Sequence, residues 1–148
     1  MIIKILPYWE FEHNAKNYTK ILSITEPTDT THPYLGEHHC ILKMFDITKE
    51  DLSVIKEQRK YWLPEKSEVL KALEFSRTWT KNDKILIHCY AGISRSPAIG
   101  FGIMWDKYKY CGKNKVEAKV EEACCSRAIR PNKIIMNHWK EIFPDFPF

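Results

Sequence analysis

Long hydrophobic runs, paired cysteines and dense clusters of basic residues are all missing from this sequence of 148 residues. Without about 18 consecutive apolar residues no membrane-spanning helix is expected, and the short apolar stretch 1–7 does not have the length of a secretory signal. The 23 basic residues barely outnumber the 19 acidic ones and are dispersed, unlike the basic patches that bind nucleic acids. These absences predict a cytoplasmic protein that binds neither membranes nor nucleic acids.

The cysteines show neither the spacing of a zinc site nor the density of a disulfide framework. They are Cys40, Cys89, Cys111, Cys124 and Cys125. The run His38-His39-Cys40 is a poor ligand set, because neighbouring residues on a strand point to opposite faces and no second ligand cluster is evident. We therefore expect free thiols and no bound metal.

Apolar residues form 44% of the chain and follow two patterns. Runs of strand length bounded by turn residues occur at residues 2–6, 21–24, 40–45 and 84–88. Helical patterns occupy residues 10–20, 48–64, 65–80, 97–105, 116–124 and 131–142. Early strands followed by accumulating helices predict one α/β domain over residues 1–148, a central mixed, mostly parallel sheet flanked by helices.

Two helix starts carry recognisable capping residues. The segment Thr48-Lys49-Glu50-Asp51 resembles a capping box, in which the first side chain and the fourth bond each other's backbone N–H groups. Asn132, which follows Arg130 and Pro131, is expected to cap the last helix.

One loop carries residues suited to phosphate chemistry. The strand 84–88 leads through a loop containing Gly92 into the helix that Pro97 opens. Such a loop directs several backbone N–H groups to one point, where the helix dipole adds positive potential, and glycine gives it the freedom to curl. We expect phosphate to be bound by Cys89, Tyr90, Ala91, Gly92, Ile93, Ser94 and Arg95.

Three side chains of this loop and its helix have complementary chemical roles. The converging N–H dipoles and the Arg95 guanidinium would favour the thiolate form of Cys89, the nucleophile. The planar fork of Arg95 matches two phosphoryl oxygens. Ser96 is placed to donate a hydrogen bond to the sulfur, which helps the sulfur to leave. The three residues predict phosphoryl transfer to a cysteine.

The order His88, Cys89, five residues, Arg95 and Ser96 is the pattern HCxxGxxRS. It resembles the signature loop of the protein tyrosine phosphatase superfamily, and the small size of the chain resembles the compact dual-specificity branch. The resemblance implies a phosphocysteine intermediate and neither a cofactor nor a metal. It also implies that His88 orients the loop and is not a proton shuttle.

The family also implies a general acid on a separate loop, just after the strand that precedes the helices leading to the cysteine. Asp46 has this place, directly after the strand 40–45, although the stretch from Asp46 to Cys89 is longer than the family usually shows. Asp51 is the alternative acid. The implied mechanism has Asp46 protonate the leaving oxygen and then act as the base for the attacking water.

The expected substrate is phosphotyrosine in a partner protein, with phosphoserine and phosphothreonine as further substrates of the dual-specificity type. A non-protein substrate, such as a phosphoinositide or an RNA 5′ phosphate, is the alternative. It ranks lower because Tyr90, Ala91, Ile93 and Ser94 add no basic side chain for a highly charged headgroup. A catalytically silent phosphoprotein-binding module is a further alternative, against which the intact loop argues.

Overall fold

The structure, a computed structural model, describes residues 1–55 and 60–148. Its sheet has four strands in the spatial order β1-β4-β2-β3. They are β1 (Ile2–Leu6), β2 (Lys20–Thr25), β3 (His39–Lys43) and β4 (Lys84–His88). All three pairings are parallel, so the carboxyl ends of the strands meet at one edge. The predicted α/β sheet is confirmed, and in the described ranges it has no antiparallel member.

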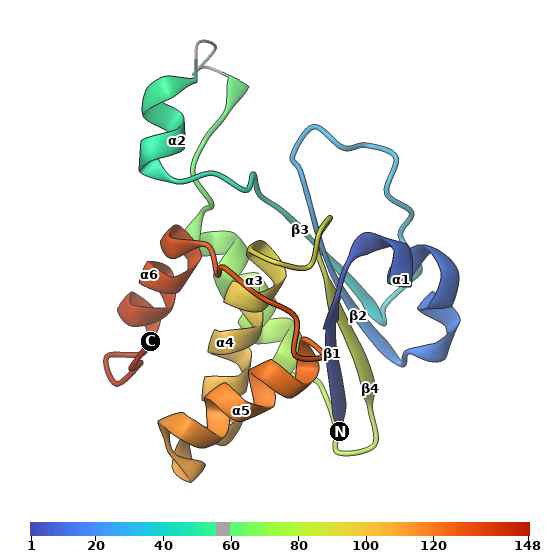
Figure 1. The fold of residues 1–148 in the computed structure, drawn as a ribbon. Helices are drawn as coiled ribbons and strands as arrows, with labels where there is room; N and C mark the ends of the chain where they lie inside the picture. The colour runs from blue at the N-terminus through green and yellow to red at the C-terminus, as the bar shows by residue number, and fades with distance from the viewer. Residues whose placement is uncertain (56–59) are drawn as a thin grey trace.

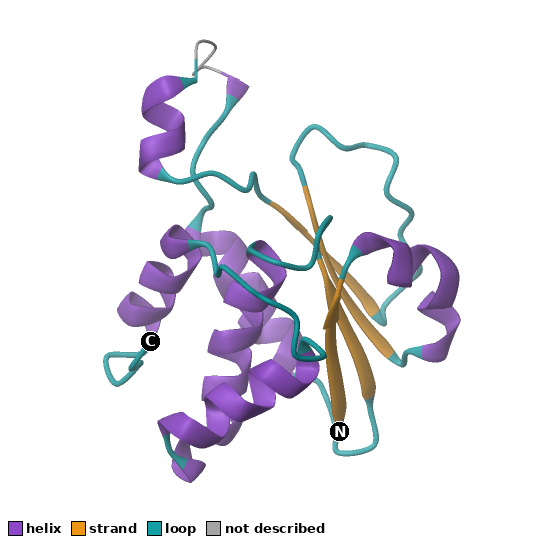
Figure 2. Ribbon diagram, viewed as in Figure 1, coloured by secondary structure: helices purple, strands orange, loops and turns teal. Residues whose placement is uncertain are grey.

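Helices cover both faces of this sheet (Figure 1). One face carries α3 (Lys66–Arg77), α4 (Arg95–Tyr108), α5 (Lys113–Ala123) and α6 (Lys133–Ile142). The other carries α1 (Tyr8–Asn14), extended by the 3-10 turn η1 (Ala15–Asn17). A second 3-10 turn, η3 (Lys109–Cys111), follows α4. The short α2 (Lys49–Val54) lies beyond the carboxyl edge of the sheet, apart from both layers (Figure 2).

The central strand β4 explains the two-layered core. Ile85 and Ile87 are fully buried in the large apolar cluster shared with α3 to α6, while Leu86 points the other way into a small cluster with Phe11 of α1. A strand buried on both faces has to be apolar at consecutive positions. Residues 85–87 have this pattern.

The expected helices are present, with differences at their ends. The helix expected at residues 10–20 is α1 followed by η1, which ends at Asn17, and Lys20 already belongs to β2. The capping box of Thr48 and Asp51 is present, but α2 ends at Val54 and not near Pro64, because Ile55 has extended backbone angles. Part of the stretch in between, residues 56–59, lies outside the described residues. The helix expected from Pro97 begins at Arg95, so this proline occupies the first turn, where its missing N–H is tolerated.

The packing of α4 against α6 depends on Gly102. Trp139 of α6 is fully buried and donates its indole N–H to the Ala98 carbonyl at 2.9 Å. A Cβ atom on Gly102 would lie 1.9 Å from the Trp139 ring, whereas one on Gly100 would meet only the flexible end of Ile5, at 2.4 Å. The contact with the indole therefore requires glycine at position 102.

We predict that Gly102→Ala lowers the free energy of unfolding by about 2–3 kcal/mol, since an overpacked core has to displace the indole. Gly100→Ala is the matched control. It should cost less, because the Ile5 side chain can rotate and alanine favours the helix by about 1 kcal/mol. Urea unfolding of both variants checks this, and equal losses would contradict the packing described.

Candidate active site

Backbone N–H groups from other segments donate to three carbonyl groups on the outer side of the loop between β4 and α4. The Tyr90 carbonyl accepts from the Tyr8 N–H at 2.9 Å, and the Ile93 carbonyl accepts from the Arg130 N–H at 2.9 Å. The Ser94 carbonyl accepts from the Asn132 N–H at 3.2 Å. Segments distant in sequence thus fix the outer side of the loop.

Gly92 allows the loop to lie against the end of β1. Its φ is +70°, in the region that favours glycine. A Cβ atom here would come within 2.8 Å of both the Leu6 carbonyl carbon and the Pro7 nitrogen. Because backbone atoms cannot move aside as a side chain does, the loop requires glycine at this position.

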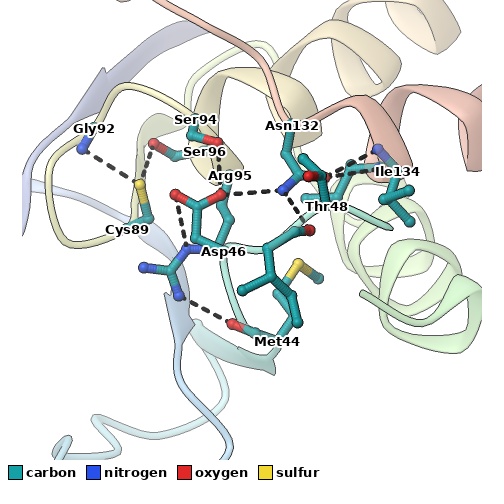
Figure 3. A network of polar contacts seen from close by, with 12 residues as sticks. Met44, Asp46, Thr48, Cys89, Gly92, Ser94, Arg95, Ser96, Asn132 and Ile134 are labelled. Atoms are coloured by element: carbon teal, nitrogen blue, oxygen red, sulfur yellow. Dashed lines mark hydrogen bonds and ion pairs between the residues drawn. The ribbon is translucent and has the colours of Figure 1, made fainter. Parts of the chain in front are cut away.

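The sulfur of Cys89 lies inside this loop (Figure 3). The side chain is only 2% exposed. Its Sγ accepts from the Gly92 N–H at 3.3 Å and lies 3.2 Å from the Ser96 Oγ. The structure therefore brings Cys89, Gly92 and Ser96 together as the sequence predicts, with two hydrogen-bonding groups around one thiol.

Arg95 lies at the start of α4 with its guanidinium buried beside the loop. The residue is 5% exposed, and its Nη1 donates to the Met44 carbonyl at 2.9 Å. Its Nε lies 3.9 Å from Asp46 Oδ2 and has no hydrogen-bond partner among the described residues. A buried, incompletely paired guanidinium is a strong site for an oxyanion.

The structure separates the two candidate acids. Asp46 Oδ1 accepts from the Ser94 hydroxyl at 2.6 Å and from the Asn132 amide at 3.1 Å, which joins Asp46 to the loop (Figure 3). Asp51 instead accepts from the Thr48 N–H at 2.7 Å and caps α2. Position therefore favours Asp46.

Asn132 has two functions in the structure. Its Oδ1 caps α6 by accepting from the N–H groups of Ile134 and Ile135 at 3.0 and 3.3 Å, which confirms the expected cap. Its amide nitrogen donates to Asp46 and, at 3.2 Å, to the Ile47 carbonyl. The second function goes beyond the cap, which alone accounts for an asparagine in this sequence context.

A cavity of about 350 Å³ opens beside Cys89 and Arg95. Its other walls include Tyr8, Thr25, Glu26, Asp29, His32 and Tyr90. Asp46 is not among the described residues that line this cavity. It lines a second hollow of about 280 Å³, together with Ser94 and Asn132. The cavity thus combines a thiol and a guanidinium with aromatic and acidic walls.

His88 is buried on the inner side of the loop. Its Nδ1 lies 3.3 Å from the Cys89 carbonyl oxygen, and its Nε2 lies 2.6 Å from the Ser23 hydroxyl. Burial lowers the pKa of His88 to about 3, so the ring is neutral at physiological pH. This agrees with an orienting residue and not with a proton shuttle.

The described part of the chain contains no group of three or more histidine, cysteine or acidic side chains that could hold a metal ion. None of the described helices has the length and apolar character needed to cross a membrane.

Buried histidines make stability depend on pH. Burial lowers the pKa of His39 to about 4 and that of His88 to about 3, whereas the unfolded chain binds these protons at about pH 6.5. Below that pH the unfolded state holds more protons, so the free energy of unfolding should fall as the pH decreases. Urea unfolding at about pH 7 and about pH 5 measures this, and a flat profile would contradict neutral buried rings.

Comparison with known proteins identifies the fold. No family model matches this chain, and no curated protein sequence does. The solved structure of a human tyrosine phosphatase-like serine/threonine/tyrosine-interacting protein is similar, with a TM-score of 0.58 and 18% identity over 92% of this chain and 83% of that one.

Two further structures are similar over most of their length. The PTP-2 phosphatase of Cydia pomonella has a TM-score of 0.57 and 15% identity, covering 90% of this chain and 77% of its own. PTPMT1, solved in complex with PI(5)P, has a TM-score of 0.55 and 15% identity, covering 97% and 90%. With its four parallel strands, its helices on both faces and its loop after β4, the chain has the fold of the protein tyrosine phosphatase superfamily.

Proposed function

We propose that this protein is a cysteine-dependent phosphatase that hydrolyses phosphotyrosine through a phosphocysteine intermediate. One observation carries the proposal: the Cys89 sulfur lies 3.3 Å from the Gly92 N–H and 3.2 Å from the Ser96 Oγ, in a cavity wall that it shares with the buried Arg95. A thiol in contact with a backbone N–H and beside a guanidinium is suited to attack a bound phosphoryl group.

The proposed reaction has two steps. The Cys89 thiolate attacks phosphorus, the bond to the ester oxygen breaks, and Asp46 gives that oxygen a proton. Water then attacks the phosphocysteine while Asp46 takes up its proton, and the sulfur leaves as a thiolate that accepts a hydrogen bond from Ser96. Arg95 binds two phosphoryl oxygens in both steps.

The walls of the cavity support phosphotyrosine as the substrate. Tyr8 and Tyr90 offer aromatic surface next to Cys89, against which a phenyl ring can pack. Glu26 and Asp29, two acidic residues, line the same cavity, and their negative charge would disfavour additional phosphates. We therefore rank phosphoinositides and RNA 5′ phosphates second, although the similar PTPMT1 was solved with PI(5)P.

A phosphorylated protein in the cytoplasm is the proposed partner, with phosphoserine and phosphothreonine as further candidate substrates. All five cysteines are free in the structure, as a reducing compartment requires.

We predict that the protein hydrolyses p-nitrophenyl phosphate in the presence of a metal chelator and that Cys89→Ser lowers kcat on the order of 10⁴-fold, because the nucleophile is lost. Cys111→Ser, at an exposed cysteine beyond the end of α4 opposite the loop, is the control and should retain activity. Full activity of Cys89→Ser would reject the mechanism. A panel of phosphopeptides, phosphoinositides and 5′-phosphorylated RNA then ranks the substrates, and binding of phosphotyrosine peptides without turnover would favour a silent binding module.

Asp46→Asn should reduce turnover of phenyl phosphate about 10²- to 10⁴-fold, since a poor leaving group needs its proton. It should affect p-nitrophenyl phosphate less, because that leaving group departs without full protonation. Asp51→Asn is the matched control, expected to weaken the cap of α2 and leave the leaving-group dependence unchanged. Equal losses of Asp46→Asn on both esters would mean that Asp46 only supports Arg95.

A further inference from the structure

A buried chain of hydrogen bonds crosses three neighbouring strands of the sheet. His39 of β3 and His88 of β4 both contact the hydroxyl of Ser23 in β2, with Nε2 to Oγ distances of 2.7 and 2.6 Å. Ser23 is fully buried, and the two histidines are 3% and 1% exposed. Ser23 is also the register partner of His88. The three side chains therefore meet away from solvent, behind the phosphate loop.

The groups at the two ends determine where each proton lies. The Leu35 N–H can only donate, and it contacts His39 Nδ1 at 3.2 Å, so His39 carries its proton on Nε2. The Cys89 carbonyl can only accept, and it contacts His88 Nδ1 at 3.3 Å, so His88 carries its proton on Nδ1. His39 then donates to Ser23, and Ser23 donates to His88.

In this order each donor of the series has one acceptor, and each hydrogen bond contains one proton. If His88 were protonated on both nitrogens, the Ser23 oxygen would face two donors and its own proton would have no acceptor in the chain. Such a buried unpaired group costs about 1–3 kcal/mol. Both rings are therefore neutral. The hydrogen bonds run, from donor to acceptor, from the loop 26–38 to the backbone of Cys89.

We propose that Ser23 and His39 are positioning residues that hold His88, and through it the Cys89 carbonyl, in the orientation that places the sulfur under the Gly92 N–H. This role rests on the proposed phosphatase function. The hydrogen bonds also connect two walls of the cavity. One wall is the loop with Leu35, which also contributes Glu26, Asp29 and His32, and the other is formed by His88 and Cys89. Neither residue touches the reacting atoms.

Matched variants separate the hydrogen bonds from simple packing. Ser23→Ala removes the hydroxyl, whereas Ser23→Thr keeps it on a side chain that suits a strand. His39→Phe keeps a ring without polar atoms, whereas His39→Gln offers an amide oxygen to the Leu35 N–H and an amide N–H to Ser23. The first variant of each pair removes a hydrogen bond of this series, and the second preserves it.

We expect Ser23→Ala and His39→Phe to lower kcat for p-nitrophenyl phosphate about 10- to 100-fold with little change in KM, in line with the loss of residues that orient a reactive group. The pH midpoint of Cys89 inactivation by iodoacetate should rise in both, because a misaligned loop stabilises the thiolate less. Ser23→Thr and His39→Gln should stay near the wild type in both measurements. A rate loss without a shift of the midpoint, or equal losses within a pair, would overturn the proposal.

A spectroscopic test does not depend on turnover. Long-range 15N–1H correlation spectra of the histidine rings in the wild type should show the Nε2–H tautomer for His39 and the Nδ1–H tautomer for His88. The opposite tautomer at either ring, or a charged ring at neutral pH, would overturn the proposed chain even if the variants fail to fold. A wild type with the expected tautomers that hydrolyses no phosphate ester would reject the proposed function. The hydrogen-bond arrangement would then stand, but the positioning role would be rejected together with the function.

Discussion

The close approach of Gly92 to the backbone at the end of β1 is the constraint on which the loop between β4 and α4 depends. With a φ of +70° and no room for a Cβ atom beside Leu6 and Pro7, the chain turns back tightly enough for the Gly92 N–H to reach the sulfur of Cys89. The parallel sheet makes this approach possible, because β1 pairs directly with β4 and their carboxyl ends lie side by side.

The second wall of the site is a network of charges and amides from three parts of the chain. Asp46 follows β3, Arg95 opens α4 and Asn132 caps α6, and they meet around Asp46. Because Asn132 forms hydrogen bonds both within its own helix and with Asp46, the position of α6 is linked to that of Asp46. The packing of Trp139 of α6 against Gly102 of α4 therefore contributes to the geometry of the site from a distance.

The sequence could predict the residues of the loop because they are consecutive, and a pattern of neighbours is visible in one dimension. The strand runs 2–6 and 84–88 also match the structure. Burial on both faces gives β4 its continuous apolar residues 85–87, whereas β1, at the edge of the sheet, alternates between buried and more exposed residues. The choice between Asp46 and Asp51 stayed open, because both follow the strand and only the fold shows which one reaches Arg95.

Ser23 and His39 were not predicted as part of the site, for a related reason. Their partners lie on other strands, so neither spacing nor periodicity connects them with His88. A small polar residue inside the buried run 21–24 was the one available signal, and a serine there is compatible with ordinary packing. Strand order, which the sequence pattern leaves undetermined, is what brings the three together.

The loop carbonyls have a thermodynamic consequence for ligand binding. Tyr90, Ile93 and Ser94 are each bonded to a different distant residue, so the conformational entropy of the loop is lost when the chain folds and not when a ligand arrives. A cradle ordered in advance would bind the phosphoryl group of the proposed substrate whatever is attached to it. If the proposed reaction holds, inorganic phosphate, its product, should compete with the ester for the same N–H groups.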